Sequence, residues 1–298
     1  MRPNSARLWQ DFIANYDRVH VYTIHPGAHA IARELVPLLR SMGRLGTWYA
    51  AAWSAAQQEG TTSADEMAHV LQPGDALVVG QSTVFADTQA VLKQAAAAGA
   101  TSIFVFDHWK NYAAHFGDGP LPDVIVVPDA IAAASIVDLF GNETRSRIRV
   151  LPHLAIEAAA DRILTSGIVE ETGMVALLLD PTEAADGLGY DWRSVLAAVL
   201  RKKHSASVRR VLVKPHPRQD VGVVARELSL IHPDHLEAEM FSGDTEHLIA
   251  RASEVWGMTT IALNIALAAN KPIRSFQFGR NEVGLRASNP HLEPYVIH

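Results

Sequence analysis

The sequence predicts an α/β protein of two Rossmann-like, doubly wound domains, and three observations support this. Short apolar runs of strand length alternate with longer helical runs along nearly the whole chain. The strand candidates are continuously apolar, which is typical of parallel strands covered by helices on both faces. The alternation stops once, in residues 157–173, which carry no strand signal. We therefore expect an N-terminal domain over 1–156, a linker over 157–173 and a C-terminal domain over 174–298.

The individual elements follow from local composition. The predicted strands cover 19–24, 46–53, 76–80, 102–106, 123–127 and 148–152 in the first domain, and 174–180, 209–215, 236–241, 254–257 and 272–278 in the second. Helical runs separate them, among them 29–43, 88–100, 192–203 and 259–271, and Gly99 is placed to end the second of these. Ligands of such sheets bind beyond the carboxyl ends of the strands, so two facing domains would form a cleft there.

Composition narrows the class of protein. The chain has 298 residues, of which 48% are hydrophobic and 19% charged, as in ordinary globular proteins. A net charge of -6 gives no general attraction to nucleic acid, and the absence of cysteine excludes disulfides and thiolate chemistry. No apolar run approaches the length of a membrane span, and the first residues lack a secretory pattern. We expect a cytoplasmic protein without nucleic-acid partners; a peripheral membrane or assembly partner stays open.

The run "VLVKPHP" (211–217) ends a predicted strand in a basic cluster. Two prolines flank His216, and proline fixes its own φ and biases the preceding residue toward extended backbone. A restricted imidazole between Lys214 and Arg218 is suited to bind phosphate and to stabilise charge on a leaving phosphate. The alternative is a rigid strand-to-loop turn with solvated basic side chains.

The run "EVWGMTTIALNIALAANKPI" (254–273) is the second candidate. Its strand ends at Gly257, and an amphipathic helix follows. Thr259 or Thr260 can cap this helix, whose first N–H groups would point into the cleft. A helix N-terminus with hydroxyls favours anions. An ordinary cap without a ligand is the alternative.

Together, the two runs resemble the nucleotide-sugar domain of GT-B glycosyltransferases. More narrowly, they resemble surface-polysaccharide transferases with an HP motif. These include sialyltransferase-like and Kdo-transferase-like enzymes and the CDP-glycerol glycerophosphotransferases of teichoic acid synthesis. The resemblance covers about residues 174–278 and implies two Rossmann-like domains facing a cleft, the GT-B architecture.

The resemblance also implies roles for particular residues. His216 would contact the phosphate of the donor nucleotide, and Thr259 and Thr260 would hold the same phosphate from the helix end. Many GT-B domains carry a glutamate in this helix, placed to bind ribose, whereas this chain has Asn264 near that position. Because HP-type enzymes commonly use cytidine donors, the resemblance implies a CMP-activated sugar, such as a nonulosonic acid, as a substrate and no cofactor.

The N-terminal domain should hold the acceptor, and "FVFDHWKNYAAHF" (104–116) is its most distinctive segment. An acid, an imidazole and an aromatic ring at a strand end suit sugar binding and proton abstraction. Asp107 is the candidate general base and His108 its rival, while Trp109 and Asn111 are candidates for the cleft. The alternative is that Asp107 caps the next helix and Trp109 packs in an interface.

Further candidates share a position just after a predicted strand. Toward the acceptor these are His25, Gly27, Gln81 and Ser82; toward the donor base or sugar they are Asp180, Thr182 and Glu183. The glycine permits a close approach of backbone. No HExxH spacing or histidine–carboxylate cluster indicates a metal, and no GxGxxG follows the first strand, so a dinucleotide enzyme is not expected.

These features together predict a metal-independent glycosyltransferase of polysaccharide biosynthesis that moves a sugar from a CMP-linked donor to a glycan acceptor. Transfer of glycerol phosphate from CDP-glycerol is one alternative, and a nucleotide-sugar epimerase of GT-B-like fold is another. A non-catalytic GT-B-like binding subunit is the alternative from a different class.

Overall fold

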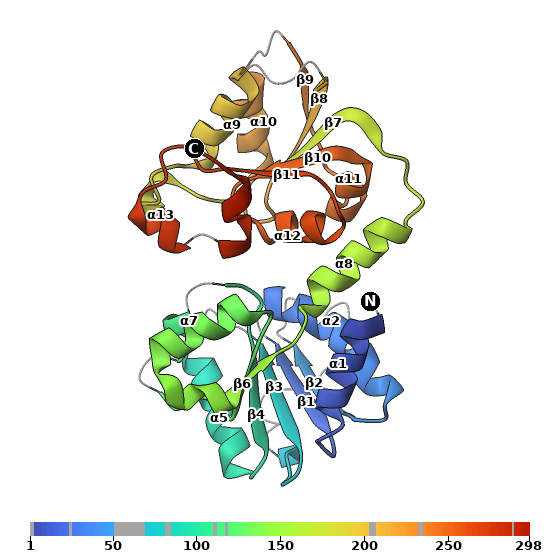
Figure 1. Cartoon of the computed structure of the whole chain (residues 1–298), viewed down its shortest axis with the longest axis vertical. Helices are drawn as coiled ribbons and strands as arrows, with labels where there is room; N and C mark the ends of the chain where they lie inside the picture. The colour runs from blue at the N-terminus through green and yellow to red at the C-terminus, as the bar shows by residue number, and fades with distance from the viewer. Residues whose placement is uncertain are drawn as a thin grey trace. The chain divides into compact units, whose positions relative to one another are not determined.

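The computed structural model describes residues 3–23, 26–50, 69–80, 85–109, 112–116, 119–202, 207–231, 235–287 and 289–298. The chain divides into two compact units, residues 1–158 and 159–298. Each unit is a parallel sheet with helices on both faces (Figure 1). This confirms the predicted pair of Rossmann-like domains. His25, Gln81, Ser82 and Asn111 lie outside the described residues.

The first unit has a six-stranded sheet in the order β2-β1-β3-β4-β5-β6. Its strands are β1 (Val19–Thr23), β2 (Leu45–Ala50), β3 (Ala76–Gly80), β4 (Thr101–Val105), β5 (Val124–Val127) and β6 (Ile148–Val150). The described helices are α1 (Pro3–Ile13), α2 (Pro26–Ser41), α5 (Phe85–Ala97), α6 (Tyr112–Phe116), α7 (Ala130–Phe140) and the 3₁₀ helix η1 (Asn142–Arg147). Gly99, at a φ of 70°, follows α5 as predicted.

The second unit has a six-stranded sheet in the order β12-β11-β10-β7-β8-β9. Its strands are β7 (Glu171–Leu178), β8 (Arg210–Lys214), β9 (Glu237–Met240), β10 (Ala252–Gly257), β11 (Ile273–Phe276) and β12 (Val296–Ile297). The described helices are α9 (Trp192–Arg201), α10 (Val221–Ser229), α11 (Thr245–Arg251), α12 (Ile261–Ala268), α13 (Glu282–Ala287) and the 3₁₀ helices η2 (Ala184–Asp186) and η3 (Pro290–Tyr295). Helix α8 (Leu154–Thr165) spans the boundary between the units.

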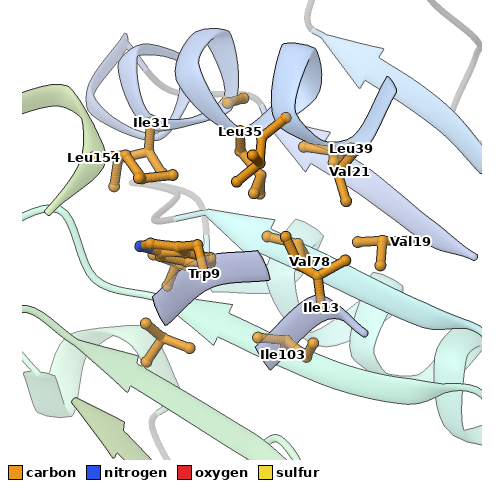
Figure 2. Close-up of a cluster of buried hydrophobic side chains, with 14 of the residues drawn as sticks. Trp9, Ile13, Val19, Val21, Ile31, Leu35, Leu39, Val78, Ile103 and Leu154 are labelled. Carbon is orange, nitrogen blue, oxygen red and sulfur yellow. The ribbon is translucent and has the colours of Figure 1, made fainter. Parts of the chain in front are cut away.

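Alternate strand residues point to opposite faces, and this alternation builds two cores in each unit. On one face of the first sheet, α1 and α2 pack on the strands, and Figure 2 shows the side chains that meet there: Trp9, Ile13, Val19, Val21, Ile31, Leu35, Leu39, Val78, Ile103 and Leu154. On the other face, α5, α6 and α7 cover Leu77, Val79 and Phe104.

The second unit repeats this arrangement. Helices α9 and α10 cover the face that carries Val175, Leu177 and Val213. Helices α8, α11 and α12 cover the opposite face, which carries Ala176 and Leu212.

The structure differs from the predicted elements in two places. Residues 157–173, expected to connect the domains without a strand, contain most of α8 and the first residues of β7. The strand begins with Glu171 and Thr172, whose polar side chains hide its start from an apolar pattern. The two-residue β12 is too short to leave a pattern. Within the described ranges, no helix has the length and apolar character needed to cross a membrane.

Trp9 should be a main anchor of the first unit. Its side chain is 1% exposed, and its Nε1 donates a hydrogen bond to the Pro152 carbonyl at 2.9 Å. Trp9→Ala should lower the free energy of unfolding of this unit by about 3–5 kcal/mol, because a large buried ring is lost. Urea unfolding followed by circular dichroism measures this.

Leu8→Ala is the matched control on the same helix. Leu8 is 48% exposed, so its truncation should change the free energy of unfolding by less than about 0.5 kcal/mol. Equal losses for the two variants would show that α1 does not dock through Trp9.

Candidate functional site

The order of the second sheet creates a switch point between β7 and β10. The chain proceeds from β7 to β8 and β9 on one side, then crosses to β10 and β11 on the other. At such a point the loops that leave neighbouring strands diverge and open a space beyond the strand ends, where ligands of doubly wound sheets bind. Asp180 follows β7, His216 follows β8, and Thr259 follows β10, so three of the predicted residues belong to this edge.

Asp180 joins the two strands that flank the switch point. Its side chain is 5% exposed. Its Oδ2 accepts hydrogen bonds from the Thr259 backbone N–H at 2.6 Å and from Thr259 Oγ1 at 2.9 Å. The Thr259 side chain is also hydrogen-bonded to Tyr190, and burial together with the Asp180 charge raises the pKa of Tyr190 to about 12. Both donors of Thr259 are thus engaged with a carboxylate of the chain itself.

The loop after β8 is a tight turn closed by Gln219. The Gln219 N–H donates to the His216 carbonyl at 2.9 Å, and the His216 N–H donates to Gln219 Oε1 at 2.7 Å. Gln219 Nε2 then donates to the Asp180 carbonyl at 3.1 Å. The turn is therefore fixed by the two prolines and is also fastened to the end of β7.

The His216 ring is oriented by its own loop. Its Nδ1 accepts a hydrogen bond from the Arg218 N–H at 3.1 Å, so the neutral ring carries its proton on Nε2. Burial lowers the pKa of His216, the Asp180 carboxylate raises it, and the Arg218 charge lowers it. The ring therefore presents Nε2 as a donor, at a position where a carboxylate and a cation act on it in opposite directions.

The two basic neighbours of His216 differ in their surroundings. Lys214 Nζ donates to the Gly243 carbonyl at 2.6 Å and lies 5.8 Å from the centre of the Phe241 ring. This ammonium is held at the end of β9. The Arg218 side chain is exposed, and none of the described residues forms an ion pair with it.

Helix α12 begins beside the Asp180–Thr259 contact. Thr260 is its N-cap, and its hydroxyl accepts from the Ala262 N–H at 3.4 Å. Within the described ranges, the N–H groups of Thr260 and Ile261 have no acceptor, and these are donors that a helix start offers to an anion. Asn264 is 6% exposed, and neither atom of its amide has a partner in the part of the chain that the structure describes.

Two other predicted donor-site residues have local partners. Thr182 Oγ1 donates to Met258 Sδ at 3.7 Å. Glu183 accepts from Trp192 Nε1 at 2.9 Å and forms an ion pair with Arg193 at 2.6 Å. These contacts order the loop between β7 and α9.

In the first unit, Asp107 lies two residues beyond β4 and is 6% exposed. A Cβ atom at residue 27 would lie 1.6 Å from Asp107 Oδ2, so only glycine allows the first turn of α2 to approach the carboxyl group this closely. Burial raises the pKa of Asp107 to about 7. Its Oδ1 is buried and has no partner among the described residues. Such a carboxyl can exchange a proton at neutral pH.

The surroundings of Asp107 are built by residues that the sequence pattern does not single out. His153 Nε2 donates to the Asp107 carbonyl at 3.1 Å, and its Nδ1 accepts from the Ile156 N–H at 3.3 Å. Burial lowers the pKa of His153, so the neutral tautomer matches both hydrogen bonds. The Trp109 ring stacks on His153, with ring centres 6.2 Å apart, and its Nε1 donates to Asp129.

His108, the rival base, faces a different group. Its ring centre lies 5.8 Å from that of His115, a residue of α6 that is 5% exposed. Gln219, Tyr190, His153 and Asp129 are the site neighbours that sequence analysis missed. Each acts through a contact to a residue distant in the chain or through a turn, and no motif marks such contacts.

No protein-family model and no curated protein matches the chain by sequence. Solved structures do match its fold. The complex of MnaA from S. aureus with UDP aligns with a TM-score of 0.61 at 14% identity, over 89% of this chain and 80% of that one. The chain has the GT-B fold.

Two further GT-B structures support this assignment. UDP-GlcNAc 2-epimerase from Neisseria meningitidis bound to UDP-GlcNAc aligns with a TM-score of 0.55 at 10% identity, over 86% of this chain and 82% of that one. The wall teichoic acid polymerase TagF aligns with a TM-score of 0.51 at 12% identity, over 92% and 74%. At these identities the likeness concerns the fold.

Asp107→Asn should stabilise the first unit more at about pH 8 than at about pH 5. Because folding raises the pKa of Asp107 from 3.8 to about 7, the folded state holds a proton there that the unfolded chain releases. Its stabilising contribution is present at low pH and is lost as the pH rises through about 7. The gain at the higher pH should be about 2–4 kcal/mol.

Urea unfolding of both proteins across this pH range measures the difference. Asp138→Asn, an exposed carboxylate on α7, is the control and should show no such trend. A gain for Asp107→Asn that is independent of pH would mean that this carboxyl titrates at its ordinary pKa.

Proposed function

We propose that the chain is a metal-independent glycosyltransferase that binds a nucleotide-sugar donor at the switch point of its second unit and transfers the sugar to a glycan acceptor in polysaccharide biosynthesis. One observation carries the proposal: Asp180 holds both the His216 turn and the Thr259 turn, through Gln219 and through its own carboxylate. The two loops that would bind a phosphate are thereby fixed to one strand end.

The proposed phosphate contacts are groups that have no partner among the described residues. His216 Nε2 is a donor, Arg218 is an exposed cation, and the N–H groups of Thr260 and Ile261 lie at the start of α12. Departure of the sugar leaves extra negative charge on the nucleotide phosphate, which donors and a helix dipole stabilise. Lys214 and Thr259, expected as phosphate ligands, are engaged with Gly243 and Asp180, so the proposal gives them a structural role.

The donor nucleotide is the least constrained part of the proposal. The HP motif favours a cytidine nucleotide, as in CMP-linked sugars. Two of the structures with this fold hold UDP or UDP-GlcNAc, which favours uridine as the rival. Likeness to the wall teichoic acid polymerase TagF favours glycerol-phosphate transfer as the second candidate function; that reaction would use the same phosphate contacts but would attack phosphorus.

Asp107 is the proposed general base for the acceptor hydroxyl. A carboxyl with a pKa raised to about 7 is partly ionised at neutral pH and takes up a proton more readily than an ordinary carboxylate does. The orphan Oδ1 of this side chain supplies an acceptor atom. Asn264 is also buried, and its amide has no partner in the part of the chain that the structure describes; it is the proposed contact for the ribose or sugar of the donor.

His216→Ala should weaken nucleotide binding about tenfold to a hundredfold, the range expected when a hydrogen bond to a charged phosphate is lost. Isothermal titration calorimetry with CMP, CDP, UDP and GDP measures this and ranks the nucleotides. Binding of a cytidine nucleotide alone would support a CMP-linked donor. Binding of a uridine nucleotide alone would contradict the CMP-linked donor but would still support the proposed nucleotide site.

Two variants serve as controls. His247→Ala alters an exposed histidine of the same unit and should leave the affinity unchanged. Asp107→Asn, in the other unit, should keep nucleotide affinity and abolish sugar transfer. If none of the four nucleotides binds, or if His216→Ala binds them as the wild type does, the proposed site is wrong.

A further inference from the structure

The loop after β8 is held by more hydrogen bonds than its turn requires. The Gln219 N–H donates to the His216 carbonyl at 2.9 Å, which closes a four-residue turn. Pro217 stands at the second position of this turn, where its fixed φ is favoured. The backbone hydrogen bond and the proline suffice for such a turn, yet the Gln219 side chain adds two further hydrogen bonds.

The side-chain amide of Gln219 uses both its acceptor and its donor. Its Oε1 accepts from the His216 N–H at 2.7 Å, and its Nε2 donates to the Asp180 carbonyl at 3.1 Å. One amide therefore links the backbone of His216 to the end of β7. A glutamate carboxylate of the same length could accept but could not donate, so the two contacts together require an amide.

The same turn orients the imidazole of His216. The Arg218 N–H donates to His216 Nδ1 at 3.1 Å, so the ring is neutral and carries its proton on Nε2. Burial and the Arg218 charge lower the pKa of His216, and the Asp180 carboxylate opposes them only in part. The N–H that selects the tautomer belongs to the turn that Gln219 closes, so the orientation of the ring depends on the shape of this turn.

Resting on the proposed function, we propose that Gln219 is a positioning residue of the nucleotide-phosphate site: it holds the His216 loop so that the imidazole donates to phosphate from Nε2 as a neutral group. The positive charge that faces the phosphate then comes from the exposed Arg218 and from the start of α12. A neutral donor keeps its hydrogen bond at every pH above the pKa of the ring.

The wild type gives the first test, without a ligand and without a substitution. Nitrogen-15 NMR of the His216 ring at about pH 7.5 should show a protonated Nε2 and an unprotonated Nδ1, because Nδ1 accepts from the Arg218 N–H. A ring that is protonated on both nitrogens, or on Nδ1 alone, would overturn the proposal.

Gln219→Met removes both side-chain hydrogen bonds and keeps a side chain of similar length. The ring signals of His216 should move toward the mixture of tautomers of a free histidine. Affinity for nucleotide should fall about threefold to tenfold, the effect of one weakened hydrogen bond. Isothermal titration calorimetry with CMP and UDP measures the affinity, and urea unfolding establishes that the variant is folded. Wild-type ring signals and wild-type affinity in this variant would contradict the proposal, because Gln219 would then serve the turn alone.

Two further variants separate positioning from charge. Arg218→Ala removes the guanidinium but keeps the backbone N–H that donates to His216 Nδ1, so it should weaken nucleotide binding and leave the tautomer of the ring as in the wild type. Ser229→Ala alters an exposed hydroxyl on α10 of the same unit and should leave both unchanged. A change of tautomer in Arg218→Ala as large as in Gln219→Met would count against the role of Gln219.

The pH dependence of nucleotide binding connects the inference to the proposed function. From about pH 7 to about pH 8.5 the affinity of the wild type should change by less than about twofold, because the His216 ring is already neutral. A fall of about tenfold over this range would mean that an imidazolium binds the phosphate, and would overturn the inference. If the wild type binds no nucleotide while its ring signals behave as expected, the proposed function fails and the orientation of His216 by Gln219 stands.

Discussion

The hydrogen bonds between Asp180 and Thr259 are the contact on which the second unit's site depends. The residues are 79 positions apart, yet they meet because β7 and β10 are neighbours at the switch point of the sheet. A parallel sheet brings the ends of distant strands to one edge. A single buried aspartate then fixes two of the loops that leave this edge, the Thr259 loop through its carboxylate and the His216 loop through its backbone carbonyl. Without this contact the Thr259 turn, which precedes the Thr260 N-cap of α12, would lose its acceptor.

In the first unit, burial changes the pKa of a carboxyl group. Asp107 is pressed against Gly27 at the start of α2, and its carboxyl group has few donors, so its pKa rises to about 7. Asp180 is equally buried but receives two hydrogen bonds from Thr259. Two aspartates at the ends of parallel strands thus acquire different properties. The first turn of α2 offers Asp107 no donor for Oδ1 among the described residues, whereas the turn before α12 offers Asp180 both donors of Thr259.

The sequence allowed most strands to be predicted, because a parallel strand covered on both faces is apolar along most of its length. All eleven predicted strands are present: β3 has the predicted ends, and the other ten have shifted ends. The two-residue β12 was not predicted. Their position after predicted strands also placed Asp107, Asp180, His216 and Thr259 just beyond the carboxyl ends of strands, where the structure has them. The pairings could not be predicted, since Lys214 meets Gly243 and Thr259 meets Asp180 only through the folded sheet. For this reason Lys214 and Thr259 were predicted to bind the phosphate, whereas in the structure their donors bind Gly243 and Asp180.

We propose that the switch point of the second unit binds a nucleotide phosphate. Backbone amide shifts of the isotopically labelled protein, recorded with increasing CMP or UDP, test it most directly. We expect the amide signals of His216, Arg218, Thr260 and Ile261 to shift. Amides at the opposite end of the strands, such as that of Arg210 at the start of β8, should not shift. Shifts confined to other parts of the chain, or none at saturating nucleotide, would contradict it.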